Sequence, residues 1–459
     1  MNFNRVIFGI IAILGALFVS MQADMMFEET LSIGLFIYFL LDFIDSIGRS
    51  YRIMDIPILL ALFQCMLMPA VVYHVYNDDQ MVVALKYDMG VSAETYYGFM
   101  FPAIISFILG AKIISWTYPN YDQKFYRAVL HSRQYLIGKG SIGTLLIIIG
   151  VVTGIMKFFV PGELYYIAYL MNLLLYVGVL YTYLSDAKNK KWYLLGGFAF
   201  ILIQSVTQGM FGELVYTLSL SILLLLLGNK IKASVKFSVA ITGFIFVMVL
   251  QSIKADYRDI TWRGIGGTGE SKTQVFISLI SDRLTNPKRF FDLALLFPTI
   301  NRFNEGMIVG KVMDYVPKSA PFAEGETVFK SLAASFVPRL LWPDKPMAGG
   351  HFNMIRFTGF QIEGYSMNIS PMGEAYGNFG VEGGIAFMFF YGLFFAVVIL
   401  IILIMIKKRP TLVLWLPVLF LNSVQMETDI LMCVNSLIKN ILFISFCFWA
   451  FNKFLRIKL

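Results

Sequence analysis

The sequence predicts an all-α, polytopic membrane protein with about twelve transmembrane helices and one large extracytoplasmic loop of short helices. The first observation is composition, because 58% of the 459 residues are hydrophobic and only 14% are charged, whereas soluble domains carry about 25% charged residues. The second is a mean hydropathy of +0.71. The third is the recurrence of long apolar runs along the chain. Together they exclude a soluble enzyme, a fibrous protein and a disordered chain.

Twelve apolar runs have the length of a membrane span, since a helix needs about 20 mainly apolar residues to cross the hydrocarbon core. They lie near 6–22, 31–47, 54–75, 97–117, 140–160, 164–184, 192–210, 213–229, 237–253, 380–406, 411–427 and 431–451. The first run follows a basic start and lacks a small-residue cleavage pattern, so we expect an uncleaved signal anchor rather than a signal peptide.

The short loops predict the orientation of the chain. On one side they carry about nineteen Lys or Arg residues, and on the other only Lys86 and Lys157. Short cytoplasmic loops are the positive ones, so both termini are predicted to be cytoplasmic. The net charge of +8 is explained in the same way, and we expect no nucleic-acid partner. The chain then divides into spans one to nine (1–253), an extracytoplasmic loop domain (254–379) and spans ten to twelve (380–459).

Cys65, Cys433 and Cys447 all lie in apolar runs, so they predict neither a disulfide framework nor a zinc site. We expect no metal ion and no cofactor. The chemistry is therefore sought in the 254–379 loop, because long loops in compact proteins are usually functional.

The loop is predicted to contain short helices and no sheet. Asn286 and Pro287 are typical of a helix start, which would run through Leu296. Thr327–Phe336 has apolar residues at helical spacing, and either helix could lie in the membrane interface or pack on the external helix ends.

Residues 264–269 match the G-x-G-x-x-G dinucleotide fingerprint, but no strand precedes them and the predicted location is outside the cytoplasm. We interpret this segment as a flexible connector. The alternative is a glycine-rich turn beside Arg258 and Arg263 that offers N–H groups to a diphosphate.

Positive charge gathers in and just after a second motif, FVPRLLWPDKP at 336–346. Its prolines and Trp342 restrict the backbone, and the charges are those of Arg339, Lys345, His351 and Arg356. Arginine binds phosphate oxygens in a bidentate manner, so this loop fits a lipid diphosphate. The alternative is that Arg339 and Lys345 pair with Asp344 or with lipid headgroups.

The third segment, Tyr365–Gly380, leads directly into a predicted span. Glu374 would lie one or two turns above the hydrocarbon, where it could act as a base facing the arginine loop. The alternative is a carboxylate that caps the start of the tenth span, because anions favour helix N-termini.

The motifs WPDKP and S-x-x-G-E-A-Y-x-N-F-G, followed by a predicted span, resemble bacterial oligosaccharide repeat-unit polymerases of the Wzy type. The resemblance covers about Val337–Gly384, and the rest is similar only in hydropathy and topology. Related sequences often carry an arginine in a short external turn between earlier spans. Here that turn, 208–213, contains none.

The resemblance implies a metal-independent glycosyltransferase of the bacterial cytoplasmic (inner) membrane that makes O-antigen, capsule or exopolysaccharide. It would transfer the nascent glycan from undecaprenyl diphosphate to a new lipid-linked repeat unit, beside membrane lipid, and a chain-length regulator protein could be a further partner. On this hypothesis the catalytic residues are Glu374, Arg339 and His351. Residues that bind diphosphate or glycan would be Lys345, Arg356, Arg258, Arg263, Trp342, Tyr365 and Ser370.

Two other functions remain open on the sequence alone. One is a flippase or exporter of lipid-linked oligosaccharides, although no pair of broken helices recurs in corresponding halves of the chain. The other is a polyprenyl-phosphate-dependent glycosyltransferase or an O-antigen ligase.

Overall fold

The structure, a computed structural model, describes residues 3–76, 82, 87–264, 269–286, 288, 293–337, 341–343, 345–346, 350–361 and 367–459. Within these ranges the chain is all-α and contains no strand, as predicted. The first helices are α1 (Phe3–Ser20), α2 (Phe27–Ser46), α3 (Asp55–Leu62), α4 (Met68–Val71), α6 (Ala93–Thr117), α7 (Tyr121–Leu136), α8 (Gly140–Met156), α9 (Gly162–Asn172), α10 (Leu174–Leu184), α11 (Lys190–Gln208), α12 (Gly212–Leu226) and α13 (Ala233–Arg263).

The later helices are α14 (Lys272–Thr285), α15 (Leu293–Phe303), α16 (Glu305–Tyr315), α17 (Glu326–Phe336), α18 (His351–Thr358), α19 (Ser370–Ile406), α20 (Leu416–Leu419) and α21 (Ile430–Phe454). Two π-helical turns, η1 (Phe63–Leu67) and η2 (Val72–Tyr76), continue α3 and α4 as one apolar helix. A 3₁₀ turn, η4 (Pro410–Trp415), precedes α20.

The prediction of about twelve transmembrane helices is wrong by the criteria of length and composition. In the described part of the chain six helices are long and apolar enough, or seven if α7 and α8, bent by 100°, form one broken span. The six are Asp55–Tyr76, Ala93–Thr117, Leu164–Leu184, Ala233–Arg263, Ser370–Ile406 and Ile430–Phe454.

The other predicted spans fail for local reasons. The run at 411–427 is apolar, but its helix ends at Leu419 and the chain then turns. Helices α1 and α12 are continuous but short, and α2 carries four acidic residues. The run at 411–427 is thus buried without a full crossing, whereas most of the apolar side chains of α1 are exposed.

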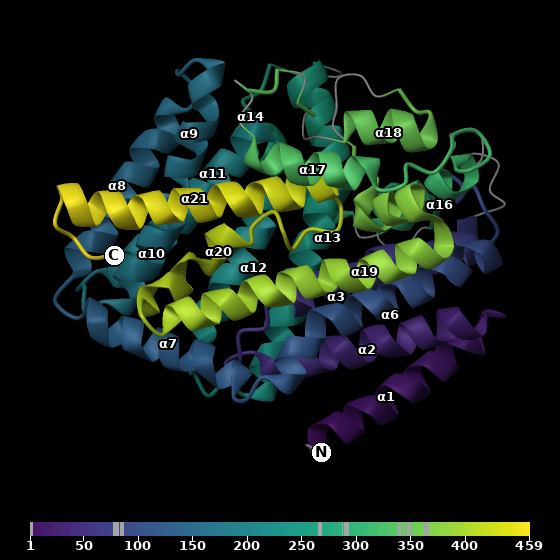
Figure 1. Ribbon diagram of the computed structural model, residues 1–459, viewed down its shortest axis with the longest axis horizontal. Helices are drawn as coiled ribbons and strands as arrows, with labels where there is room; N and C mark the ends of the chain where they lie inside the picture. Colours follow the sequence, from purple (N-terminus) through teal and green to yellow (C-terminus); the bar gives the residue numbers. More distant parts are fainter. Residues whose placement is uncertain are drawn as a thin grey trace.

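The long helices pack closely through small residues. In Figure 1, α19 and α6 lie side by side across the middle of the molecule, next to α3 and α2. A Cβ atom on Gly110 would collide with the backbone of α19, and one on Gly392 with the backbone of α6. Such close approach between helices is typical of membrane proteins, where packing replaces the hydrophobic drive of water.

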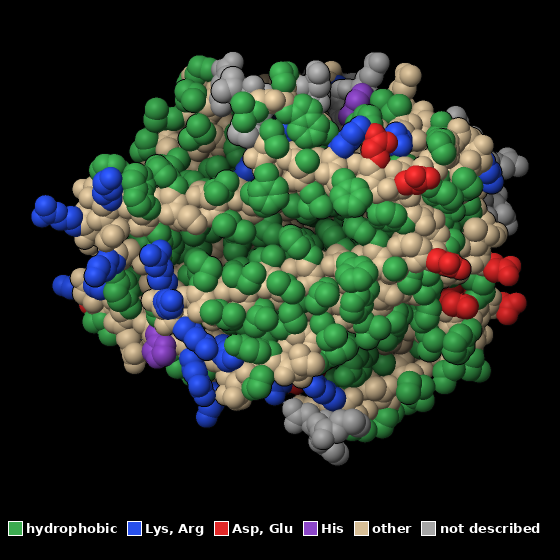
Figure 2. All heavy atoms as spheres, viewed as in Figure 1, with side chains coloured by type: hydrophobic (Ala, Val, Ile, Leu, Met, Phe, Trp, Pro, Cys, Tyr) green, Lys and Arg blue, Asp and Glu red, His purple; other side chains and the backbone are tan. Residues whose placement is uncertain are grey.

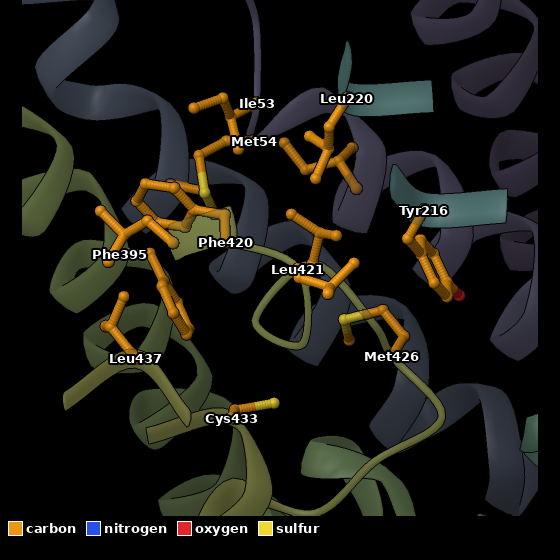
Figure 3. Packing of buried hydrophobic residues seen from close by; sticks show 14 of the residues in the cluster. Ile53, Met54, Tyr216, Leu220, Phe395, Phe420, Leu421, Met426, Cys433 and Leu437 are labelled. Atoms are coloured by element: carbon orange, nitrogen blue, oxygen red, sulfur yellow. The ribbon is translucent and has the colours of Figure 1, made fainter. Parts of the chain in front are cut away.

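The segment between α20 and α21 is held by the apolar core although it is not helical. Figure 3 shows Phe420, Leu421 and Met426 from this segment packed among side chains that include Phe395 and Tyr216. Phe420, Leu421 and Met426 are all at most 2% exposed. The backbone on either side of Glu427 is therefore fixed by packing.

The predicted 254–379 loop is largely helical. Helix α13 extends into it as far as Arg263, and α14 to α18 lie in the rest of it. The predicted helix at Thr327–Phe336 is confirmed as α17. Asn286 does not begin a helix as predicted, since it is the C-terminal cap of α14, while Pro287 lies outside the described residues. Helix α19 begins at Ser370 and bends at Gly380, whose φ of 67° favours glycine.

Charged side chains separate along the molecule in the way the loop pattern predicts. Figure 2 shows Lys and Arg gathered at the left and lower-left edge and Asp and Glu at the right edge. Which end faces the cytoplasm stays a prediction.

Candidate functional site

Five charged side chains from distant parts of the chain lie close together and form what we term the five-charge cluster. Their charges act on one another across helix α13, the end of α15, the start of α16 and the segment before α21. They are Lys254, Arg258, Arg302, Glu305 and Glu427.

Helix α13 contributes Lys254 and Arg258, which are four residues apart and therefore share a helix face. The Arg258 guanidinium donates from Nε to the Gly209 carbonyl oxygen at 3.1 Å and lies 4.5 Å from the centre of the Trp262 ring. Gly209 belongs to the 208–213 turn, where related sequences often carry an arginine. Arg258 brings a guanidinium to the same turn from another helix.

Arg302 and Glu305 lie on either side of the break between α15 and α16. Asn304 fixes this break, because its side-chain oxygen accepts a hydrogen bond from the Met307 N–H at 3.1 Å. Burial, together with the nearby Glu427 carboxylate, raises the pKa of Glu305 from its ordinary value of 4.5 to about 8. The helix N-terminus favours the carboxylate form by up to about 2 kcal/mol. This is less than the rise in pKa to about 8 represents, so burial determines the direction of the shift.

Glu427 is held by side chains from two other elements. Gln64, in the π-helical turn η1, donates to the Glu427 carboxylate at 3.2 Å, and Tyr216 of α12 lies beside the same carboxylate. The Asn368 amide donates to the Glu427 carbonyl oxygen at 3.4 Å. Irregular π turns within helices often occur at functional sites.

The cluster contains charges and polar atoms that the protein itself leaves unmatched. Within the described ranges, Lys254, Arg302 and Glu305 form no ion pair or side-chain hydrogen bond, although Lys254 and Glu305 are half-buried. Among the residues that the structure describes, no donor reaches the buried amide oxygens of Gln64 and Asn368. Buried polar groups are normally satisfied, and this cluster has three cations against two carboxylates. It is therefore suited to an anionic ligand.

Glu374, the predicted base, lies in a different environment. It is completely buried, and its two carboxylate oxygens accept from the Thr327 hydroxyl at 2.8 Å and from the Ile430 N–H at 3.0 Å. Asn378 completes the network by donating to Thr327 and to the Glu374 carbonyl, each at 2.7 Å. Glu374 thus caps the N-terminus of α21, whereas the sequence alternative placed it as a cap of its own helix.

A crevice beside this network is very small. It holds about 20 Å³ and is lined by residues of α17, α18 and α21, among them Ser331, Asn353 and Asp429. This volume admits about one water molecule, so a sugar unit does not fit without rearrangement.

The other predicted site residues are not gathered at one point. His351 is exposed at the start of α18, and Arg356 on the same helix forms an ion pair with Glu326 at 2.9 Å. Lys345 donates to the Val337 carbonyl at 2.9 Å, and Arg263 pairs with Asp259 at 3.1 Å.

Four predicted site residues remain, namely Ser370, Trp342, Arg339 and Tyr365. Ser370 is buried, and its hydroxyl accepts from the Met372 N–H at 3.3 Å. Trp342 is half-buried in a non-helical segment. Arg339 and Tyr365 lie outside the described residues. Of the predicted residues, Arg258 alone is in the five-charge cluster.

Sequence reasoning missed Lys254, Arg302, Glu305 and Glu427. The usable signal was their position, since Lys254 lies one turn from Arg258 in a long apolar helix and Glu427 ends an apolar run. Ionisable residues in such segments are expensive to bury and are usually functional.

The long apolar helices indicate an all-α, multi-pass membrane protein. A family model described as "Domain of unknown function (DUF8712)" matches residues 124–404, and the chain therefore belongs to this family. The matched range includes four members of the five-charge cluster and ends before Glu427. No curated protein and no solved structure matches the chain.

Proposed function

We propose that the protein polymerises undecaprenyl-diphosphate-linked oligosaccharide repeat units at the outer face of the bacterial cytoplasmic membrane. The observation that carries the proposal is the five-charge cluster, whose unpaired cations lie within a helical membrane protein. The resemblance of the 337–384 segment to repeat-unit polymerases supports the same reaction. This choice moves the reacting groups from the Arg339–Glu374 pair to Arg258, Arg302 and Glu305.

The cations would bind the diphosphate of the donor. Lys254, Arg258 and Arg302 carry three positive charges, and Arg302 has no ion-pair partner among the residues the structure describes. Guanidinium groups bind phosphate oxygens bidentately. Preorganised cations also stabilise charge as it develops on a leaving group. The diphosphate is already a good leaving group, so no metal ion is required.

Glu305 would accept the proton of the attacking hydroxyl. Efficient general bases have a pKa near the working pH, and that of Glu305 is about 8. In the transfer, the acceptor sugar oxygen forms a bond to the anomeric carbon of the nascent glycan. The bond from that carbon to the diphosphate oxygen breaks, undecaprenyl diphosphate leaves with the electron pair, and the hydroxyl proton goes to Glu305.

Reconstitution tests this proposal. The purified protein is placed in lipid vesicles with undecaprenyl-diphosphate-linked repeat units from its own organism, and the product is separated by length. We expect a ladder of lipid-linked polymer with wild-type protein and only single units with Glu305→Gln. The matched control is Glu326→Gln, an exposed carboxylate outside the cluster.

Other products would overturn the proposal. Movement of single units across the membrane without polymer would indicate a flippase. Transfer of a preformed polymer to a different acceptor would indicate a ligase.

A further inference from the structure

A second group of charges lines a cavity of about 350 Å³, away from the five-charge cluster. Its wall is built from α1, α2, the turn before α3, α6 and α7. The charged lining residues are three cations and three carboxylates: Arg5, Arg52, Lys112, Asp42, Asp55 and Asp122. The proposed polymerisation uses none of them.

Arg52 is the centre of this second group. Its guanidinium lies 2.5 Å from the Asp42 carboxylate, 3.7 Å from that of Asp55 and 3.9 Å from that of Asp122. Of these, only the contact with Asp42 has the length of a hydrogen bond. Arg5 also reaches Asp42, at 3.2 Å, and Lys112 bonds the other oxygen of Asp55. One guanidinium is thus shared among three acids.

Two carboxylates are therefore short of donors. The Asp55 side chain is 2% exposed, and in the described part of the chain its Oδ2 atom has no hydrogen-bond donor. Asp122 is 43% exposed, and its ion-pair contact with Arg52 is too long for a hydrogen bond. A buried carboxylate oxygen without a donor is unfavourable, so this wall of the cavity is suited to a ligand that carries N–H donors and positive charge.

The same cavity also offers positive charge to an anionic group of the ligand. Arg5 is 46% exposed, and Lys112 has three N–H donors, whereas among the described residues its ion pair is with Asp55 alone. The lining contains as many cations as carboxylates, so a neutral ligand with both signs leaves it balanced.

Aromatic side chains beside the cavity favour a position at a membrane surface. Trp116 is 62% exposed and lines the cavity together with Tyr38. Trp and Tyr concentrate at the level of lipid headgroups. Lys and Arg side chains gather at the lower left of the face that Figure 2 shows.

We propose that this cavity binds the phosphoethanolamine headgroup of a phospholipid. The primary ammonium donates to Asp55 and Asp122, and the phosphate accepts from Arg5 and Lys112. A choline headgroup has the same net charge but no N–H donor, so it leaves Asp55 unsatisfied. An anionic glycerol headgroup supplies no positive charge to the carboxylates.

Lipid exchange into nanodiscs tests the proposal with the full chain. Native mass spectrometry measures the lipids retained from an equal mixture of phosphatidylethanolamine, phosphatidylcholine and phosphatidylglycerol. We expect preferential retention of phosphatidylethanolamine. Asp122→Asn should reduce this retention about tenfold, the loss typical of a hydrogen bond to a charged group. The matched control is Asp314→Asn. Asp314 lies on α16, is 49% exposed and pairs with Lys318 in the turn that follows this helix. This substitution should leave the retention of each lipid unchanged.

A second variant distinguishes a loss of lipid binding from a loss of folding. Arg5→Gln removes a half-exposed cation from the phosphate end and should also reduce retention of phosphatidylethanolamine. Equal retention of the choline and ethanolamine lipids, or full retention by both variants, would overturn the proposal. Competition by millimolar free O-phosphoethanolamine with no lipid retained would also overturn it, because the ligand would then be a soluble one.

Discussion

Glu374 and Glu305 are both carboxylates at helix N-termini on the loop side of the molecule, and they differ in what surrounds them. The Glu374 oxygens accept from Thr327 and Ile430 at hydrogen-bond distance, and nothing of the side chain is exposed. Glu305 has no such partner in the described ranges and lies beside Lys254 and Arg302. Burial affects both groups, but hydrogen bonds satisfy only the first.

The difference indicates what each region contributes. A carboxylate whose hydrogen bonds are complete has little left to offer a substrate, so it stabilises the fold. A cluster with unpaired charges costs stability unless a ligand completes it, and strained or unsatisfied sites are typical of function. Four experiments test whether the two regions differ in this way.

The largest expected effect comes from the cations of the five-charge cluster. Arg302→Ala and Arg258→Ala should each lower the rate of polymer formation by about 10²–10³, the usual loss when one preorganised donor to developing charge is removed. The initial rate in reconstituted vesicles measures it. Arg263→Ala, on the same helix as Arg258 but paired with Asp259, should keep the wild-type rate. An equal loss in all three variants would contradict a specific role.

Removal of the Glu374 carboxylate should destabilise the protein. In Glu374→Ala the Thr327 hydroxyl and the Ile430 N–H lose their acceptor, at a cost of about 2–3 kcal/mol. Chemical unfolding in detergent, followed by tryptophan fluorescence, measures the change in free energy. The rate per folded molecule should be retained. An unchanged unfolding free energy with a lost rate would instead return Glu374 to the reacting groups.

The pH dependence of the rate should follow Glu305. A base must be deprotonated, and the deprotonated fraction rises as the pH passes the pKa of about 8. The rate should therefore increase about tenfold between pH 7 and pH 9. Glu305→Gln should abolish this rise, whereas Glu374→Gln should preserve it. A flat profile in the wild type would exclude Glu305 as the base.

The smallest effect is expected at the exposed ion pairs of α17. Lys330, at 2.5 Å, and Arg356 lower the pKa of Glu326, so the pairs stabilise the fold above the ordinary pKa of a glutamate and cease to do so when the pH falls through the lowered value. Glu326→Gln should cost less than about 1 kcal/mol at neutral pH. The difference from wild type should vanish on acidification, as unfolding curves at both pH values would show.

Local patterns were enough to predict individual helices. Apolar residues at helical spacing predicted 327–336, and α17 is Glu326–Phe336. The run at 411–427 was overinterpreted, because hydropathy reports burial and not continuity, and the helix there ends at Leu419. Burial without a helix is possible at this point because the side chains of Phe420 and Leu421 pack into the core.

The candidate site was less predictable than the helices. Arg258 was selected because a glycine-rich segment follows it in the sequence. In the structure it lies beside Lys254 and Arg302. Glu374 was selected for its motif. In the structure its carboxylate oxygens accept hydrogen bonds from α17 and α21. A motif gives the type of side chain, but not which donors surround it.

Composition and apolar runs determined by themselves that this chain is an all-α membrane protein with charge concentrated between the apolar runs, because a run of about 20 mainly apolar residues suits a membrane span whatever it packs against. The tertiary structure alone decided which charges meet, since Lys254, Glu305 and Glu427 come from segments far apart in the chain. It also decided which of the two carboxylates, Glu374 or Glu305, is satisfied by hydrogen bonds. That outcome depends on donors delivered by other helices, and no pattern within a single segment encodes it.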